Sequence, residues 1–279
     1  MDFTRDPRVS VSSAGFIITV NFVILPVQIQ IHMSGHSKWS TIKRKKGAAD
    51  AKRSKMFSRV SKEIQLAARE GGPDPEMNPR LRLAINNAKG INMPKDNIER
   101  AINRASREAD SLQEVTFEGY APHGIAIFIE CLTDNHNRTV SNIRAIFNRR
   151  GGSLGTNGSV AYMFDRKGVI TVPKAGLDQE EFELEIIDAG VEDVELEGDV
   201  FIITTAMEDF GNVQKKLEEM GIEAENAELQ RIPHDTTELD PEDALKVMKV
   251  VEDLEDDDDV QNVYHNLELT DSLVAAMDS

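Results

Sequence analysis

Apolar side chains recur three and four positions apart in three stretches of the chain, 54–70, 78–90 and 94–108. This spacing gives a helix one apolar face, so each stretch predicts an amphipathic helix. Asn78 followed by Pro79 predicts the start of the second helix, because asparagine favours the N-cap and proline favours the first helical position. Three such helices with short connections predict a small helical bundle.

Near residue 115 the pattern changes to runs typical of strands. Strands are predicted at 115–120, 125–132 and 160–164, with a helix at 137–150. The same kind of alternation then repeats as strand 168–172, helix 178–189, strand 191–197, strand 200–205, helix 208–220 and strand 222–231. The order βαββαβ predicts a ferredoxin-like arrangement, in which two helices cover one face of an antiparallel sheet.

A last helix at 241–254 and a last strand at 260–267 remain. The earlier block, 115–164, would accept one more helix and one more strand, so we expect the end of the chain to return and complete it. The predicted fold class is therefore α+β: an N-terminal helical bundle followed by two α+β domains, one of them ferredoxin-like and inserted in the other. The expected domains are 33–110 for the basic helical domain, 111–167 plus 234–279 for the first α+β domain, and 168–233 for the inserted domain.

Charge divides the chain as clearly as hydropathy does. Residues 33–107 hold 18 Lys/Arg and 7 Asp/Glu, a net charge of +11, whereas residues 108–279 hold 12 Lys/Arg and 40 Asp/Glu, a net charge of −28. The overall charge of −17 hides this split. A basic segment joined to an acidic body indicates a polyanion-binding part of the protein.

Residues 1–32 contain an apolar run at 14–31. No net positive charge precedes this run, and Asn21 and Pro26 interrupt it, so it does not match a signal peptide or a membrane anchor well. We interpret 1–32 as a non-native or disordered extension ahead of a true start at Met33, and we expect no membrane partner. The single cysteine, Cys131, excludes an internal disulfide and favours a reducing compartment.

Six segments between residues 33 and 164 carry a resemblance to a known family: MSGHSKWSTIK, AADAKRSKMFS, NMPKDNIERAI, FEGYAPHGIA, TDNHNRT and GGSLGTNGSVAYMF. Together and in this order they resemble the YebC/PmpR family. The resemblance implies three domains, a cytoplasmic protein and a role as a probable transcriptional regulator. It also implies a competing role, as a ribosome-associated factor that helps translation through difficult sequences such as proline runs. It implies no catalytic residue and no cofactor.

A dense basic cluster around one tryptophan is the main candidate site. Cationic side chains at this density predict contact with phosphates and release of condensed counterions, and Trp39 offers either a stacking platform for a base or a core anchor. Other cations on the outward helix faces either extend this surface or form an ordinary solvated helix face: Lys62, Lys95, Arg100 and Arg104. The predicted nucleic-acid-binding residues are Lys38, Trp39, Lys43, Arg44, Lys45, Lys46, Lys52, Arg53, Lys55 and Arg59.

A secondary contact is predicted at Arg138 and at three glycines of the loop 151–159: Gly151, Gly152 and Gly155. The alternative for the loop is a tight glycine turn, since it lacks the ending of a phosphate-binding P-loop. The polar residues 134–139 are interpreted as a helix-capping turn rather than a metal site. The acidic run 253–259 lacks calcium-loop spacing, so we expect a solvated loop there.

Three classes of function are compared. A non-enzymatic nucleic-acid-binding regulator fits the basic segment, and its target is DNA, ribosomal RNA or the ribosome. A metal- or nucleotide-dependent enzyme would need clustered carboxylates or a nucleophile–base pair, and we find neither in the sequence. A membrane-tethered adaptor would rest on residues 14–31 alone. The sequence leaves open the choice between DNA and RNA, the target site, the oligomeric state and any regulatory ligand.

Overall fold

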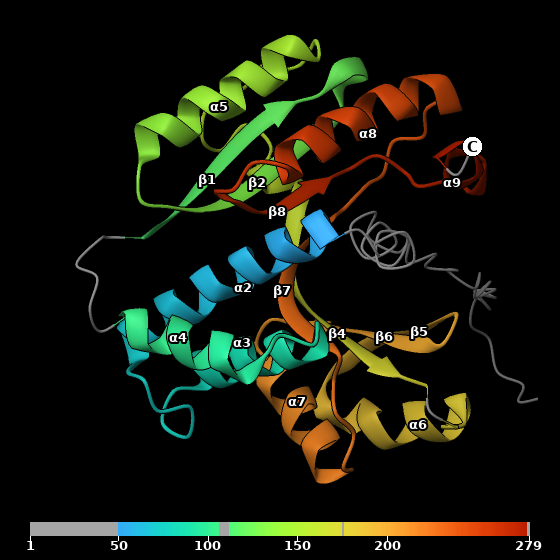
Figure 1. Cartoon of the computed structure of the whole chain (residues 1–279). Coiled ribbons are helices and arrows are strands. Elements are labelled where there is room, and N and C mark those ends of the chain that lie inside the picture. The colour runs from blue at the N-terminus through green and yellow to red at the C-terminus, as the bar shows by residue number, and fades with distance from the viewer. Residues whose placement is uncertain (1–49, 106–111, 175, 278–279) are drawn as a thin grey trace, which may run out of the picture. The chain divides into compact units, whose positions relative to one another are not determined.

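The computed structural model describes residues 50–105, 112–174 and 176–277 and shows helices packed with two four-stranded antiparallel sheets (Figure 1). The predicted α+β class is confirmed. The N-terminal extension predicted at 1–32 lies outside the described residues, and so does the end predicted for the third helix.

The first three helices are α2 (Asp50–Gly71), α3 (Pro79–Gly90) and α4 (Lys95–Ala105). Their apolar faces form one core, which includes Ile64, Leu81, Ala88 and Ile98. Asn78 caps α3 as predicted, because its side chain accepts a hydrogen bond from the backbone N–H of Leu81 at 3.0 Å. The Asn78 amide also donates to the carbonyl oxygens of Ala67 and Gly72, which ties the end of α2 to the start of α3.

The first α+β domain contains a sheet with the strand order β3-β1-β2-β8. Helices α5 and α8 cover one face of this sheet, and their apolar residues share a core with Ile127, Ile129 and Val263. The last helix and strand therefore return to complete this domain, as the sequence predicts. Its elements are β1 (Gln113–Tyr120), β2 (Ala126–Thr133), α5 (His136–Arg149), β3 (Ser153–Leu154), α8 (Pro241–Glu255), β8 (Val260–His265) and α9 (Asp271–Met277).

The second sheet has the order β5-β6-β4-β7, so the first and third strands of the βαββαβ unit are central. This is the ferredoxin-like topology predicted above. Phe182 and Val213 bring helices α6 and α7 onto one face of the sheet, where they meet Ile170 and Phe201. The elements are β4 (Phe164–Pro173), α6 (Gln179–Ile186), β5 (Val191–Glu197), β6 (Val200–Ala206), α7 (Phe210–Glu219) and β7 (Asn226–Pro233).

The strand predicted at 160–164 is wrong. A short 3-10 helix, Ala161–Met163, occupies this stretch, and β4 begins only at Phe164. The physical reason is that the backbone N–H groups of Val160 and Ala161 donate to the Glu118 carboxylate at 2.7 and 2.8 Å instead of to a neighbouring strand. The third strand of the first sheet is the two-residue β3, Ser153–Leu154, which is not among the strands predicted above.

Helix α3 packs against the second sheet through Leu83, and its Asn87 side chain hydrogen-bonds to the outer edge of that sheet. The Asn87 amide donates to the Ala227 carbonyl oxygen at 2.9 Å, and its oxygen accepts from the Ala227 N–H at 3.0 Å. Strand β7 is an edge strand, so the asparagine side chain supplies the pair of hydrogen bonds that another strand would make. This contact joins the helical domain to the ferredoxin-like domain.

Replacing Asn87 with alanine removes both hydrogen bonds and exposes the Ala227 N–H to water. A loss of about 1–2 kcal/mol of local protection predicts that hydrogen exchange at Ala227 speeds up by roughly 5- to 30-fold. The matched control is Asn86→Ala, because Asn86 is the exposed neighbour on the same helix. Native-state hydrogen exchange measures both variants, and equal rates at Ala227 in N87A and N86A would contradict the contact.

Candidate nucleic-acid interface

The structure describes only part of the predicted basic cluster. Lys52 belongs to α2, and Arg53 is exposed one residue later, with its guanidinium 5.8 Å from the centre of the Phe57 ring. Lys38, Trp39, Lys43, Arg44, Lys45 and Lys46 lie outside the described residues.

The next cations along α2 contact the protein's own acidic loop, which we define as residues 255–259. Lys55 Nζ lies 2.7 Å from the Asp256 carboxylate, and Arg59 donates to the Glu255 carbonyl oxygen. Lys62 Nζ donates to the Asp258 carbonyl oxygen at 2.8 Å. Positions 55, 59 and 62 share one helix face, so this face of α2 contacts the acidic loop. Two of the predicted nucleic-acid-binding residues, Lys55 and Arg59, therefore have protein partners.

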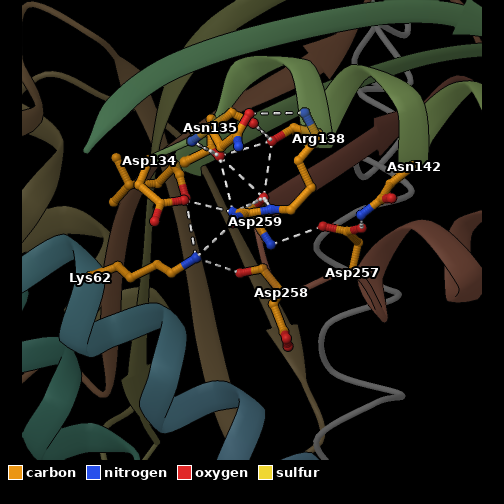
Figure 2. Close-up of polar contacts among 11 residues, drawn as sticks. Lys62, Asp134, Asn135, Arg138, Asn142, Asp257, Asp258 and Asp259 are labelled. Atoms are coloured by element: carbon orange, nitrogen blue, oxygen red, sulfur yellow. Dashed lines mark hydrogen bonds and ion pairs between the residues drawn. The ribbon is translucent and has the colours of Figure 1, made fainter. Parts of the chain in front are cut away.

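Asp259, the last residue of the acidic loop, is the centre of a polar cluster (Figure 2). Its carboxylate accepts hydrogen bonds from Lys62 Nζ at 3.1 Å and from Arg138 Nη2 at 2.7 Å. The hydroxyl oxygens of Thr133 and Thr139 lie 3.1 and 2.9 Å from the same carboxylate. Asp259 is only 3% exposed, so the interpretation of this run as a solvated loop is wrong at its last residue.

The electrostatics of this cluster follow from burial and donors together. Burial by itself raises the pKa of Asp259, but hydrogen bonds from Arg138, Lys62 and Thr139 outweigh it and hold that pKa below its usual value. Hydrogen bonds to Asp259 and Asp134 raise the pKa of Arg138. Burial lowers the pKa of Arg59 despite the nearby acidic groups.

A hollow of about 330 Å³ lies beside α2 and α4 and provides a candidate anion site. A smaller hollow of about 120 Å³ shares Ser61, Gln65 and Arg104 with it. Arg104 is exposed, and among the described residues we find no hydrogen-bond or ion-pair partner for it. Hydroxyl, amide and guanidinium groups suit a phosphate or another anion. The larger hollow is lined by Ser58, Ser61, Lys62, Gln65, Arg69, Arg104, Ala105, Leu112 and Asp134.

The glycine-rich loop binds a carboxylate of the protein itself. Glu118, which is 4% exposed, accepts hydrogen bonds from the N–H groups of Gly158, Val160 and Ala161 at 2.7–2.8 Å. Burial by itself raises the pKa of Glu118, but these backbone donors outweigh it and lower the pKa.

The three predicted glycines also use their N–H groups internally. Gly152 donates to the Phe147 carbonyl oxygen, and Gly155 to that of Glu118, while Gly151 is 3.5 Å from the Asn148 carbonyl oxygen. Gly151 adopts a left-handed φ of 76°, which favours glycine over other residues. These internal bonds weigh against a phosphate cradle built from the three N–H groups, and they agree with the tight-turn interpretation.

The capping interpretation of residues 134–139 is confirmed, since Asn135 caps α5 by accepting from the N–H of Arg138 at 3.1 Å. Within the described ranges, no three His, Cys, Asp or Glu side chains are placed to hold a metal ion. Cys131 is buried, and burial raises the pKa of its thiol. No helix in that part of the chain combines the length and apolarity needed to cross a membrane.

Sequence reasoning missed the roles of Glu118 and Asp259. Each is an acidic residue beside or within a buried strand, Glu118 inside β1 and Asp259 directly before β8. An acidic residue at a buried strand position needs donors, and this signal was available in the sequence. The donors themselves come from positions 40 to 197 residues away, so no local pattern identifies them.

Two family profiles cover most of the chain. The profile described as the TACO1/YebC protein N-terminal domain matches residues 37–108, and the profile described as the TACO1/YebC second and third domain matches residues 112–267. The chain belongs to the TACO1/YebC family. This confirms the resemblance seen in its motifs.

Individual relatives within the TACO1/YebC family agree with this assignment. A "Probable transcriptional regulatory protein" of Rubrobacter xylanophilus is 52% identical over 246 residues, which is 87% of this chain and 98% of the relative. A protein of the same name from Amoebophilus asiaticus is 52% identical over 239 residues, which is 84% of this chain and 98% of the relative. The crystal structure of a conserved hypothetical protein from Aquifex aeolicus matches with a TM-score of 0.73 and 45% identity, covering 80% of this chain and 93% of that chain. The names of the relatives support a regulatory role.

Replacing Asp259 with asparagine in this TACO1/YebC protein should strongly destabilise the contact between α2 and the first α+β domain. The neutral amide leaves Lys62 and Arg138 without their shared anion, and we expect a loss of about 2–4 kcal/mol in the free energy of unfolding. Asp258→Asn is the matched control, because the Asp258 side chain is exposed and only its carbonyl oxygen contacts Lys62. Urea denaturation measures both variants, and similar midpoints for D259N and D258N would refute a central role for Asp259.

The same carboxylate predicts an acid-sensitive contribution to stability. The pKa of Asp259 is lower in the folded protein than in the unfolded chain, where an aspartate has a pKa of about 3.9. Its contribution is therefore fully present above the unfolded pKa and is lost as the pH falls through the folded pKa. Unfolding free energies measured between neutral pH and acid should show a smaller decrease in D259N than in D258N. A parallel decrease in both variants would show that other carboxylates account for the acid sensitivity.

Proposed function

We propose that this chain is a non-enzymatic nucleic-acid-binding regulator of gene expression, acting as a DNA-binding transcriptional regulator of the YebC/PmpR type. The observation that carries the proposal is the net charge of +11 on residues 33–107, beside a body whose net charge is −28. The names of the relatives agree with a regulatory role. A cytoplasmic location is part of the same proposal and rests on the family resemblance and the lone, buried Cys131.

The contacts along α2 refine which cations serve this function. Lys55, Arg59 and Lys62 interact with the acidic loop, so the phosphate-binding role falls on the cations before them and on the hollow beside α4. The cluster Lys38 to Lys46 remains the main proposed contact, with Arg53 exposed just after it. Arg104 supplies a cation at the hollow beside α4.

A ribosome- or ribosomal-RNA-associated role in translation is the second candidate. The acidic body favours it, because 40 Asp/Glu beyond residue 107 repel the phosphates of a long duplex wherever the body approaches them. Contact is then confined to those parts of the surface that carry few acidic groups. A local contact of this kind suits a structured RNA surface better than sliding along DNA.

The first variant replaces four consecutive cations, Lys43, Arg44, Lys45 and Lys46, with glutamine. It removes four positive charges from the proposed interface. We expect affinity for DNA and RNA to fall by a factor of 10² or more at low salt, and the dependence of log affinity on log salt to become shallower by about 0.7–0.9 per lost contact. Fluorescence anisotropy over a salt series measures both quantities.

The matched control removes four positive charges from the acidic body, at Lys215, Lys216, Lys246 and Lys249. It changes net charge equally but leaves the basic cluster intact. Sucrose gradients of cell extracts at low salt distinguish the two roles. If the wild-type protein comigrates with ribosomes and the cluster variant does not, the role in translation is supported. If the wild-type protein stays free of ribosomes and protects a specific promoter DNA, the role in transcription is supported. Unchanged retention of the cluster variant on DNA, RNA and ribosomes would overturn the proposal.

A further inference from the structure

The segment 135–164 differs from the rest of the acidic body. It contains Arg138, Arg144, Arg149 and Arg150 and no aspartate or glutamate at all. The body as a whole has 40 acidic residues in 108–279, so a stretch of this length without any is a clear change in composition. Helix α5 and the glycine-rich loop make up most of this segment.

The outward side of α5 presents a row of hydrogen-bonding side chains. At about 100° per residue, Asn137, Ser141, Arg144 and Asn148 fall within roughly 60° of one another around the helix, and all four are exposed. The opposite side carries Ile143, Ile146 and Phe147, which are buried against the sheet. The row extends over about 16 Å, since a helix rises about 1.5 Å per residue. We call these four residues the α5 row.

Two acidic neighbours of α5, Asp253 and Asp257, are hydrogen-bonded by other side chains of the helix. Arg149 and Arg150 donate to the Asp253 carboxylate at 2.8 and 2.9 Å, and the Asn142 amide donates to Asp257 at 2.9 Å. Figure 2 shows Asn142 and Asp257 meeting in this way beside the Asp259 cluster. The repulsion that α8 and the acidic loop would exert on a phosphate is therefore reduced along this side of α5.

Arg144 remains available for a partner. Among the residues that the structure describes, we find no carboxylate or carbonyl group paired with its guanidinium, in contrast to Arg138, Arg149 and Arg150. Arginine and asparagine are the side chains that bind guanine and adenine edges through paired hydrogen bonds, and arginine also binds phosphates. Exposed donors whose acidic neighbours are paired with other side chains match the chemistry of nucleic acid.

We propose that the α5 row is a second nucleic-acid contact surface, distinct from the basic N-terminal domain. Arg144 binds a phosphate or a guanine edge, and the amides of Asn137 and Asn148 bind base edges or sugar hydroxyls on either side of it. This inference rests on the proposed function, because it adds a second contact to the same partner.

The test compares Arg144→Gln and the double variant Asn137→Ala/Asn148→Ala with wild type in the full-length chain. The probes are a mixed-sequence DNA duplex and a single-stranded RNA of the same length, and affinity is measured over a salt series. We expect R144Q to weaken binding of at least one probe about tenfold and to make the salt slope shallower by about 0.7–0.9. The asparagine variant should weaken binding and leave the salt slope unchanged, because it removes no charge.

The matched control is Arg166→Gln, an exposed arginine on β4 with the same change in charge. Circular dichroism and urea midpoints equal to those of wild type establish that each variant is folded. Equal losses in R144Q and R166Q, or wild-type affinity in both α5 variants, would overturn the inference while the Lys43–Lys46 region still accounts for binding. If the wild-type chain binds neither probe and no ribosome, the proposed function and this inference fail together. A loss on DNA alone or on RNA alone supports the inference and identifies which nucleic acid the row contacts.

Discussion

The buried carboxylate of Asp259 is the constraint on which the contact between the helical domain and the first α+β domain depends. Taking an ionised carboxyl group out of water costs several kcal/mol, and the cost is offset only when good donors surround it. Here the donors come from three elements: Lys62 on α2, Thr133 at the end of β2, and Arg138 and Thr139 in the first turn of α5. Each element must therefore hold its position, since losing any one donor leaves part of a buried charge unsatisfied.

The same principle organises charge elsewhere in the chain. Glu118 is buried in β1 and receives three backbone N–H groups from the glycine-rich loop, so a negative charge fixes the loop that a phosphate might otherwise have bound. Arg231 lies between Glu130, at 3.1 Å, and the Phe128 ring, at 3.9 Å from its centre, and so connects β7 to the first sheet. Glu118 and Glu130, like Asp259, are thus structural, and each of the three has specific donors.

How far the sequence predicts this structure depends on the range of the interactions. The helices α2, α3, α5 and α8 follow from spacing within one segment, and the inserted ferredoxin-like unit follows from the order of its elements. The strand expected at 160–164 fails because Glu118, about 40 residues earlier, takes the N–H groups that a strand would use. The partners of Lys55 and Arg59 are about 200 residues away, so the sequence shows two cations but not the acidic loop that binds them.

These constraints also determine which cations are available to bind a nucleic acid. A phosphate that drew Lys62 or Arg138 away would leave part of the buried Asp259 charge unsatisfied, at a cost of about 1–3 kcal/mol, which offsets the gain from one phosphate contact. Affinity must therefore come from cations that the fold does not need. In the described part of the chain, Arg104 at the hollow beside α4 and Arg144 on α5 are cations of this kind. Lys62 and Arg138, in contrast, both bind the Asp259 carboxylate. Helix α4 packs on α2, and α2 and α5 both contact Asp259. A polyanion that used both Arg104 and Arg144 would therefore bind helices whose spacing is already fixed, and it would lose little entropy in ordering them.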